Sequence, residues 1–162
     1  MAKPITQQQP RGLLRALARL PIQLFRLRLG WLLGNRFLML THTGRVSGLP
    51  RQVALEVVRH DEESDTYFVA SGWGERSDWF RNIRKTPEVI VHAGRRQIEA
   101  VSERLPLEEA ERELATYARE HPAAARSLAR LMGYQVEKLE IDFPALSSEI
   151  PIIALRPRRP SR

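Results

Sequence analysis

The sequence lacks cysteine altogether, and this absence narrows its chemistry. Without thiols the chain can form no disulfide, no thiolate metal site and no cysteine nucleophile. The four histidines share no spacing typical of metal ligands, and no serine lies in a nucleophile-elbow pattern. We therefore predict neither a metal site nor a hydrolase. The absence of cysteine also fits a reducing compartment, and we expect a cytoplasmic protein.

Acidic residues are missing from the first third of the chain. Residues 1–55 contain nine lysines and arginines and no acid, and the last seven residues add four arginines. Residues 52–155 therefore carry a net charge of −6, although the whole chain carries +7. A globular part of this sign offers no broad basic face, so we expect no nucleic-acid partner unless the two basic ends bind one by themselves.

Long uninterrupted hydrophobic runs are missing too. The apolar segment after the polar residues 1–10 is broken by arginines, so we expect neither a signal peptide nor a membrane-spanning helix there. Its leucines recur at spacings of four and three, which predicts a basic amphipathic helix within residues 11–33, kinked at Pro21. This helix can pack on the domain or on the partner subunit of a homodimer. Alternatively, it can lie peripherally on the inner face of a membrane. The apolar side comprises Leu13, Leu17, Leu20, Leu24, Leu27 and Trp31, and the basic side comprises Arg11, Arg15, Arg19 and Arg26.

The most informative stretch is FLMLTHTGRVSGLPR, residues 37–51. It begins with an apolar run at residues 37–40 that is typical of a buried strand, and it continues as a turn rich in glycine, threonine and serine. Thr43, Arg45, Ser47 and Arg51 lie in or beside this turn. Guanidinium forks, hydroxyls and free backbone N–H groups on a tight turn are suited to binding phosphate. The alternative is an ordinary hairpin with solvated arginines.

The remaining patterns predict a small barrel of the α+β class. Further strands are expected at residues 52–59, 66–71, 88–92, 97–103 and 150–155. A short helix is expected at 79–84, capped by Ser77 or Asp78, and a helical stretch at 106–132 begins with Pro106 and is divided at Pro122. Strands do not alternate with long helices, so a barrel is favoured over a doubly wound sheet. We divide the chain into a lead-in with the amphipathic helix (1–35), one globular domain (36–157) and a basic tail (158–162).

Taken in order, five motifs closely resemble the deazaflavin (F420)-dependent nitroreductase and quinone reductase family. They are LTHTGRVSGLPR, QVALEVV, YFVASGWG, DWFRNIRKTPEVIVH and EIPIIALRP. The resemblance implies a small antiparallel split β-barrel of the FMN-binding type with flanking helices. It also implies an enzyme that transfers a hydride from coenzyme F420 to a quinone or nitro compound. Relatives use FMN, and a non-catalytic protein that binds the cofactor would show the same motifs.

The resemblance also implies a set of residues around the cofactor. They are Arg45, Ser47 and Arg51 in the first motif, Ala70, Ser71 and Gly72 in the second, and Trp79, Phe80 and Asn82 in the third. Trp79 and Phe80 can equally be core residues. Tyr134 is the candidate for a hydrogen-bond donor or proton source beside the substrate. The family's Gly-Arg-Lys-Ser-Gly motif has Val46 at its third position here, so Arg76 replaces the missing cation or the protein prefers FMN.

Overall fold

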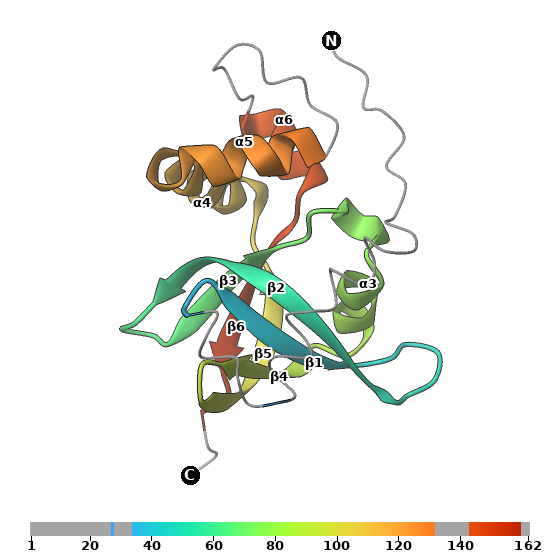
Figure 1. The fold of residues 1–162 in the computed structure, drawn as a ribbon. Helices are drawn as coiled ribbons and strands as arrows, with labels where there is room; N and C mark the ends of the chain where they lie inside the picture. The colour runs from blue at the N-terminus through green and yellow to red at the C-terminus, as the bar shows by residue number, and fades with distance from the viewer. Residues whose placement is uncertain (1–26, 28–33, 132–142, 160–162) are drawn as a thin grey trace.

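Six antiparallel strands close into a barrel in the computed structural model, which describes residues 27, 34–131 and 143–159 (Figure 1). Around the barrel the strands follow the order β1-β2-β3-β6-β5-β4. Their bounds are β1 Phe37–Thr43, β2 Pro50–Asp61, β3 Thr66–Ala70, β4 Glu88–Ala93, β5 Arg96–Arg104 and β6 Ile152–Pro157. The predicted small antiparallel barrel is confirmed.

In the described part of the chain, two groups of helices lie on different sides of the barrel (Figure 1). A single 3-10 turn, η2 (Gly74–Arg76), leads into the short helix α3 (Asp78–Lys85) after β3. Helices α4 (Leu107–Glu120), α5 (Pro122–Leu131) and α6 (Phe143–Glu149) lie together and separate β5 from β6 along the chain. Pro106 occupies the N-cap position of α4, one residue before the first helical position that the sequence suggested.

Strands β3 and β6 are buried on both faces, which explains their continuous apolar sequences. Tyr67 and Val69 of β3 point into the barrel interior, whereas Phe68 between them packs against α4 and α6. In the same way, Ile153 of β6 lies inside the barrel and Ile152 outside it. Because side chains alternate between the faces of a strand, a strand between two hydrophobic cores needs apolar residues at every position.

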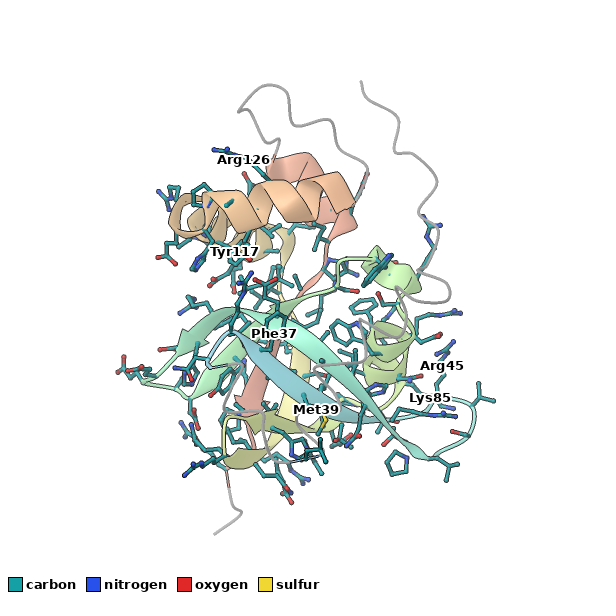
Figure 2. The ribbon with its side chains drawn as sticks, viewed as in Figure 1. Phe37, Met39, Arg45, Lys85, Tyr117 and Arg126 are labelled. Atoms are coloured by element: carbon teal, nitrogen blue, oxygen red, sulfur yellow. The ribbon has the colours of Figure 1, made fainter. Side chains whose placement is uncertain are left out.

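Strand β1 begins at Phe37, as expected, but continues three residues beyond the expected end at Leu40 (Figure 2). The extension pairs Thr41 with Gln52 and Thr43 with Pro50 across the β1–β2 ladder. Threonine is a turn former in isolation but fits a pleated strand well, because its β-branched side chain packs against neighbouring strands. Pairing with β2 therefore decided the conformation of these residues.

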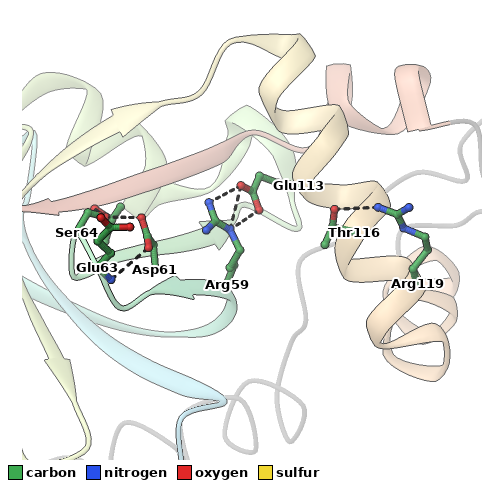
Figure 3. Close-up of polar contacts among 8 residues, drawn as sticks. Arg59, Asp61, Glu63, Ser64, Glu113, Thr116 and Arg119 are labelled. Atoms are coloured by element: carbon green, nitrogen blue, oxygen red, sulfur yellow. Dashed lines mark hydrogen bonds and ion pairs between the residues drawn. The ribbon is translucent and has the colours of Figure 1, made fainter.

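Polar contacts fasten α4 to the outside of the barrel (Figure 3). The guanidinium of Arg59 on β2 donates to both carboxylate oxygens of Glu113, at 2.9 and 2.7 Å, and stacks over the Phe68 ring at 4.2 Å. The Tyr117 hydroxyl donates to Glu56 on β2 at 2.8 Å. These contacts surround the apolar side of α4, where Leu114 packs on the second core. They connect β2 to a helix far away along the sequence.

The structure adds one helix to the expected elements, qualifies the expected cap of α3 and leaves two predictions untested. Helix α6 had no sequence counterpart, and Ser77 is the N-cap residue of α3 without a capping hydrogen bond from its side chain. The amphipathic helix proposed within residues 11–33 and the candidate Tyr134 lie outside the described residues, so both stay predictions. Within the described part of the chain, no helix has the length and apolar character needed to cross a membrane.

Candidate functional site

The loop between β1 and β2, residues 44–49, is a tight turn closed by its own backbone. The Gly44 N–H donates to the Leu49 carbonyl at 2.9 Å, and the Gly48 N–H donates back to the Gly44 carbonyl at 2.8 Å. Gly48 has a φ of +68°, which glycine adopts without strain. A Cβ at Gly44 would lie 2.7 Å from Ser47 Oγ and 3.3 Å from the Leu49 carbonyl oxygen, so a side chain there would displace the Ser47 hydroxyl from the turn. Both glycines of the motif are therefore explained by local geometry.

Helix α3 holds this loop with one polar stripe. Asp78, Asn82 and Lys85 are spaced by four and three residues, which places them on one face of the helix. All three contact Arg45: its guanidinium donates to Asp78 Oδ1 and Asn82 Oδ1, both at 2.9 Å, and its carbonyl accepts from Lys85 Nζ at 2.8 Å (Figure 2). The first and third motifs of the sequence are thus brought together around Arg45. Arg45 therefore fastens the loop to α3.

Asn82 links the loop to the buried His42 of β1. Its Oδ1 also accepts from the Arg45 backbone N–H at 3.1 Å, and its Nδ2 lies 3.1 Å from His42 Nδ1. Burial lowers the pKa of His42 to about 4, and the nearby positive charge of Arg51 adds to this effect against the opposing influence of Asp78. A neutral imidazole can accept a hydrogen bond at Nδ1. The Asn82 amide group therefore donates to this buried nitrogen of His42.

Several donors of the loop remain without partners among the described residues. The backbone N–H groups of Val46 and Ser47 find no acceptor there, and the exposed guanidinium of Arg51 has no hydrogen bond or ion pair. Ser47 Oγ accepts from the Leu49 N–H at 3.2 Å and stays solvent-exposed, whereas Thr43 is half-buried at the end of β1. Consecutive free N–H groups beside a guanidinium fit a phosphate group. This donor set satisfies the chemistry that an anionic coenzyme requires.

The second motif forms the loop between β3 and α3, and most of its polar groups are used internally. Ser71 is fully buried: its hydroxyl donates to the Gly74 carbonyl at 2.7 Å, and its N–H donates to the Pro151 carbonyl at 3.0 Å. Ala70 ends β3 and packs toward the second core. Gly72 is half-buried, and its N–H has no acceptor in the described residues. Gly72 is therefore the member of this motif with a free donor for a ligand.

The aromatic candidates of the third motif lie in the barrel core. Phe80 is 1% exposed and Trp79 is 8% exposed, with their rings edge to face at 6.2 Å. Arg84 and Arg104 cover the Phe80 ring at 6.0 and 5.6 Å. This burial is what the packing interpretation of the two aromatics expects. Arg76, at the end of η2, is exposed and has no partner among the described residues.

Sequence reasoning missed three residues that the structure places at the site: His42, Asp78 and Lys85. The first appeared as a scattered histidine, the second as a cap and the third as an ordinary helix terminus. The spacing of Asp78, Asn82 and Lys85 opposite the apolar side of α3 is the signal that could have identified two of them. Among the described residues, no group of three or more potential ligands could hold a metal ion.

Comparison with known proteins gives the chain a family. A family model described as F420H(2)-dependent quinone reductase matches residues 26–135, which is more than half of the chain. The match includes the loop between β1 and β2, the loop between β3 and α3, and all of α3. No curated protein sequence matches this chain.

Solved structures resemble the fold at low sequence identity. An F420-H2 dependent reductase (FDR-A) is 21% identical, with a TM-score of 0.52 over 75% of this chain and 94% of the other. A protein solved as a domain-swapped dimer is 20% identical, with a TM-score of 0.51 over 84% and 99% of the two chains. The haem storage protein HutZ from Vibrio cholerae is 15% identical, with a TM-score of 0.53 over 87% and 92%. These likenesses support the barrel architecture.

Proposed function

The chain belongs to the F420H2-dependent quinone reductase family, and we propose that it transfers a hydride from the reduced coenzyme to a quinone. The observation that supports coenzyme binding is the loop between β1 and β2, where the N–H groups of Val46 and Ser47 and the guanidinium of the following Arg51 have no partner among the described residues. A nitro compound is the alternative acceptor.

The chain's own residues bind and orient in this proposal. Arg51 and the loop N–H groups hold the phosphate, and Arg45 fixes the loop on α3 through Asp78 and Asn82. The Gly72 N–H lies in the loop that precedes α3 and is the candidate donor to a ring carbonyl. The coenzyme itself supplies the hydride, so the protein contributes position, charge and exclusion of water.

We assign one possible contact each to Arg76 and Tyr134. Arg76 is exposed immediately before α3 and can meet an acidic portion of the coenzyme. Tyr134 stays a candidate for hydrogen bonding to the acceptor, on the strength of the family resemblance alone. A homodimer is proposed from the domain-swapped neighbour, and contact of residues 11–33 with a membrane surface is proposed from their leucine pattern.

Binding is tested by titrating the purified protein with F420 and with FMN, followed by the fluorescence of each ligand. We expect F420 to bind more tightly. Arg51→Gln should weaken F420 binding about 10-fold, because a charge-assisted contact to phosphate is lost, with little change in thermal stability. Arg158→Gln is the matched control, since it removes the same charge from an exposed residue at the far end of β6.

Turnover is tested by mixing the protein with reduced F420 and then adding a quinone or a nitroaromatic compound, with coenzyme oxidation as the readout. Faster oxidation with the quinone than with the nitro compound supports the proposal. Tight coenzyme binding without oxidation by either acceptor would make the protein a coenzyme carrier. Equal binding of the wild-type protein and Arg51→Gln would remove the β1–β2 loop from the site.

A further inference from the structure

The loop between β3 and α3 packs against the end of α6, and Gly74 is the residue at the contact. Gly74 has a φ of +63°, and a Cβ added to it would lie 2.8 Å from the Glu149 carbonyl oxygen. Glu149 is the last residue of α6, which leads into β6 (Figure 1). A clash with a backbone carbonyl is not relieved by rotation of a side chain. Any other residue at position 74 would therefore displace the loop or the end of α6.

A hydrogen bond holds the same loop to the chain that follows α6. Strand β3 pairs with β6 as far as Ala70, and one residue further the Ser71 N–H donates to the Pro151 carbonyl at 3.0 Å. The loop therefore follows the junction between α6 and β6 from Ser71 to Gly74. Pro151 is fully buried, so the loop rests on a core part of the domain.

Two buried hydroxyls fix the loop internally. The Ser71 hydroxyl donates to the Gly74 carbonyl at 2.7 Å, and the Gly74 N–H donates to the Ser71 carbonyl at 2.9 Å. Ser77 Oγ lies 2.9 Å from Ser71 Oγ. Since the single hydroxyl proton of Ser71 goes to Gly74, the Ser77 hydroxyl donates to Ser71. Ser77 directly precedes α3, so these contacts connect the loop with the start of that helix.

The residues between the fixed points at Ser71 and Gly74 are Gly72 and Trp73. Both are half-buried, and the Gly72 N–H has no acceptor among the described residues. We propose that Ser71 and Gly74 are positioning residues, which hold the Gly72 N–H in place for the coenzyme ring by docking the loop on the end of α6. This inference rests on the proposed function and extends it, because it makes α6 part of the support of the site. The alternative is that Ser71 and Gly74 serve the stability of the fold alone.

The test compares Gly74→Asn with the matched control Gly94→Asn. Both glycines have a positive φ, +63° and +59°, which asparagine tolerates better than most residues. A Cβ at Gly94, in the turn between β4 and β5, would meet nothing within 4 Å, so only the substitution at position 74 meets a carbonyl. Thermal stability is measured without ligand, and F420 affinity is measured by fluorescence titration.

We expect Gly74→Asn to weaken F420 binding about 10-fold, whereas Gly94→Asn should stay within about threefold of the wild type. The absorption spectrum of bound F420 is recorded at saturation, because a hydrogen bond to a ring carbonyl changes the electronic state of the ring. The spectrum in Gly74→Asn should move toward that of the free coenzyme. A purely structural role would lower thermal stability and leave this spectrum unchanged.

Ser71→Ala tests the same loop without adding atoms to it. The variant removes the hydroxyl that holds the Gly74 carbonyl and should weaken F420 binding about fivefold, with the same change in the spectrum. Ser64→Ala is its control, since it removes a hydrogen-bonded hydroxyl from the turn between β2 and β3 and should leave the affinity unchanged.

Pyrophosphate is titrated in parallel, with thermal stabilisation as the readout, to separate the ring from the phosphate. It should stabilise Gly74→Asn as much as the wild type, and an equal loss of F420 and pyrophosphate binding would overturn the inference. Wild-type affinity and an unchanged spectrum in both Gly74→Asn and Ser71→Ala would also overturn it, while the proposed function would stand. If the wild type binds no F420, the proposed function fails and the inference fails with it.

Discussion

Helices α3 and α4 both pack an apolar face against the barrel, but their polar faces contact different parts of it: a strand in the case of α4 and a loop in the case of α3. On α4, Glu113 and Tyr117 pair with residues of β2, and these contacts satisfy both partners. On α3, Asp78, Asn82 and Lys85 hold the loop between β1 and β2, which still carries donors without acceptors among the described residues. Contacts of the first kind fasten a helix to the barrel, whereas those of the second kind fasten the loop that we propose as the coenzyme site.

The largest effect should come from removing the apolar anchor of either helix. Phe80→Ala on α3 should lower the free energy of unfolding by about 3–5 kcal/mol, and Leu114→Ala on α4 by about 2–5 kcal/mol, because both side chains are buried. Urea unfolding of each variant and of the wild type measures these two changes in the free energy of unfolding. Titration of the folded proteins with F420 should show weaker binding only for Phe80→Ala. Unchanged binding in that variant would show that α3 keeps its polar stripe in place without its anchor.

An intermediate effect should follow removal of the polar contacts themselves. Asn82→Ala removes the hydrogen bonds that Asn82 makes to the buried His42 Nδ1 and to the Arg45 backbone N–H. This loss should lower the free energy of unfolding by about 1–3 kcal/mol. Its F420 affinity should fall at least about 10-fold, because the loop is released from α3. Tyr117→Phe is the comparison on α4 and should cost about 0.5–1.5 kcal/mol with no change in affinity. Equal loss of F420 affinity in the two variants would contradict the proposal that α3, and not α4, supports coenzyme binding.

The smallest effect concerns pH and the buried His42. Its pKa is lowered to about 4 in the folded protein, so between its ordinary pKa near 6.5 and pH 4 the unfolded chain binds a proton that the folded chain does not. Stability should therefore fall as the pH falls through this window, by on the order of 1 kcal/mol from this group. His42→Gln should flatten the dependence. Part of it should persist, because burial also lowers the pKa of His92. Identical pH profiles for the two proteins would contradict the neutral state of His42.

The strand segments along the chain and the β1–β2 turn could be predicted because their causes are local. Alternating or continuous apolar residues indicate strands, and Gly44 and Gly48 fit the turn for reasons that lie within the turn itself. The place of Arg45 in the first turn was predicted, and its role toward the coenzyme stays a prediction. Sequence alone could not show that its guanidinium would be taken up by Asp78 and Asn82, which lie more than thirty residues away.

By itself, the sequence determined the small barrel, the glycine-rich turn that follows its first strand and the family to which the chain belongs. Those properties follow from residue order, backbone preference and charge, which are local quantities. The tertiary structure decided that the Arg45 guanidinium pairs with Asp78 and that Lys85 donates to the Arg45 carbonyl. These contacts depend on the folded barrel, because the loop and α3 are more than thirty residues apart along the chain and meet only in the tertiary structure.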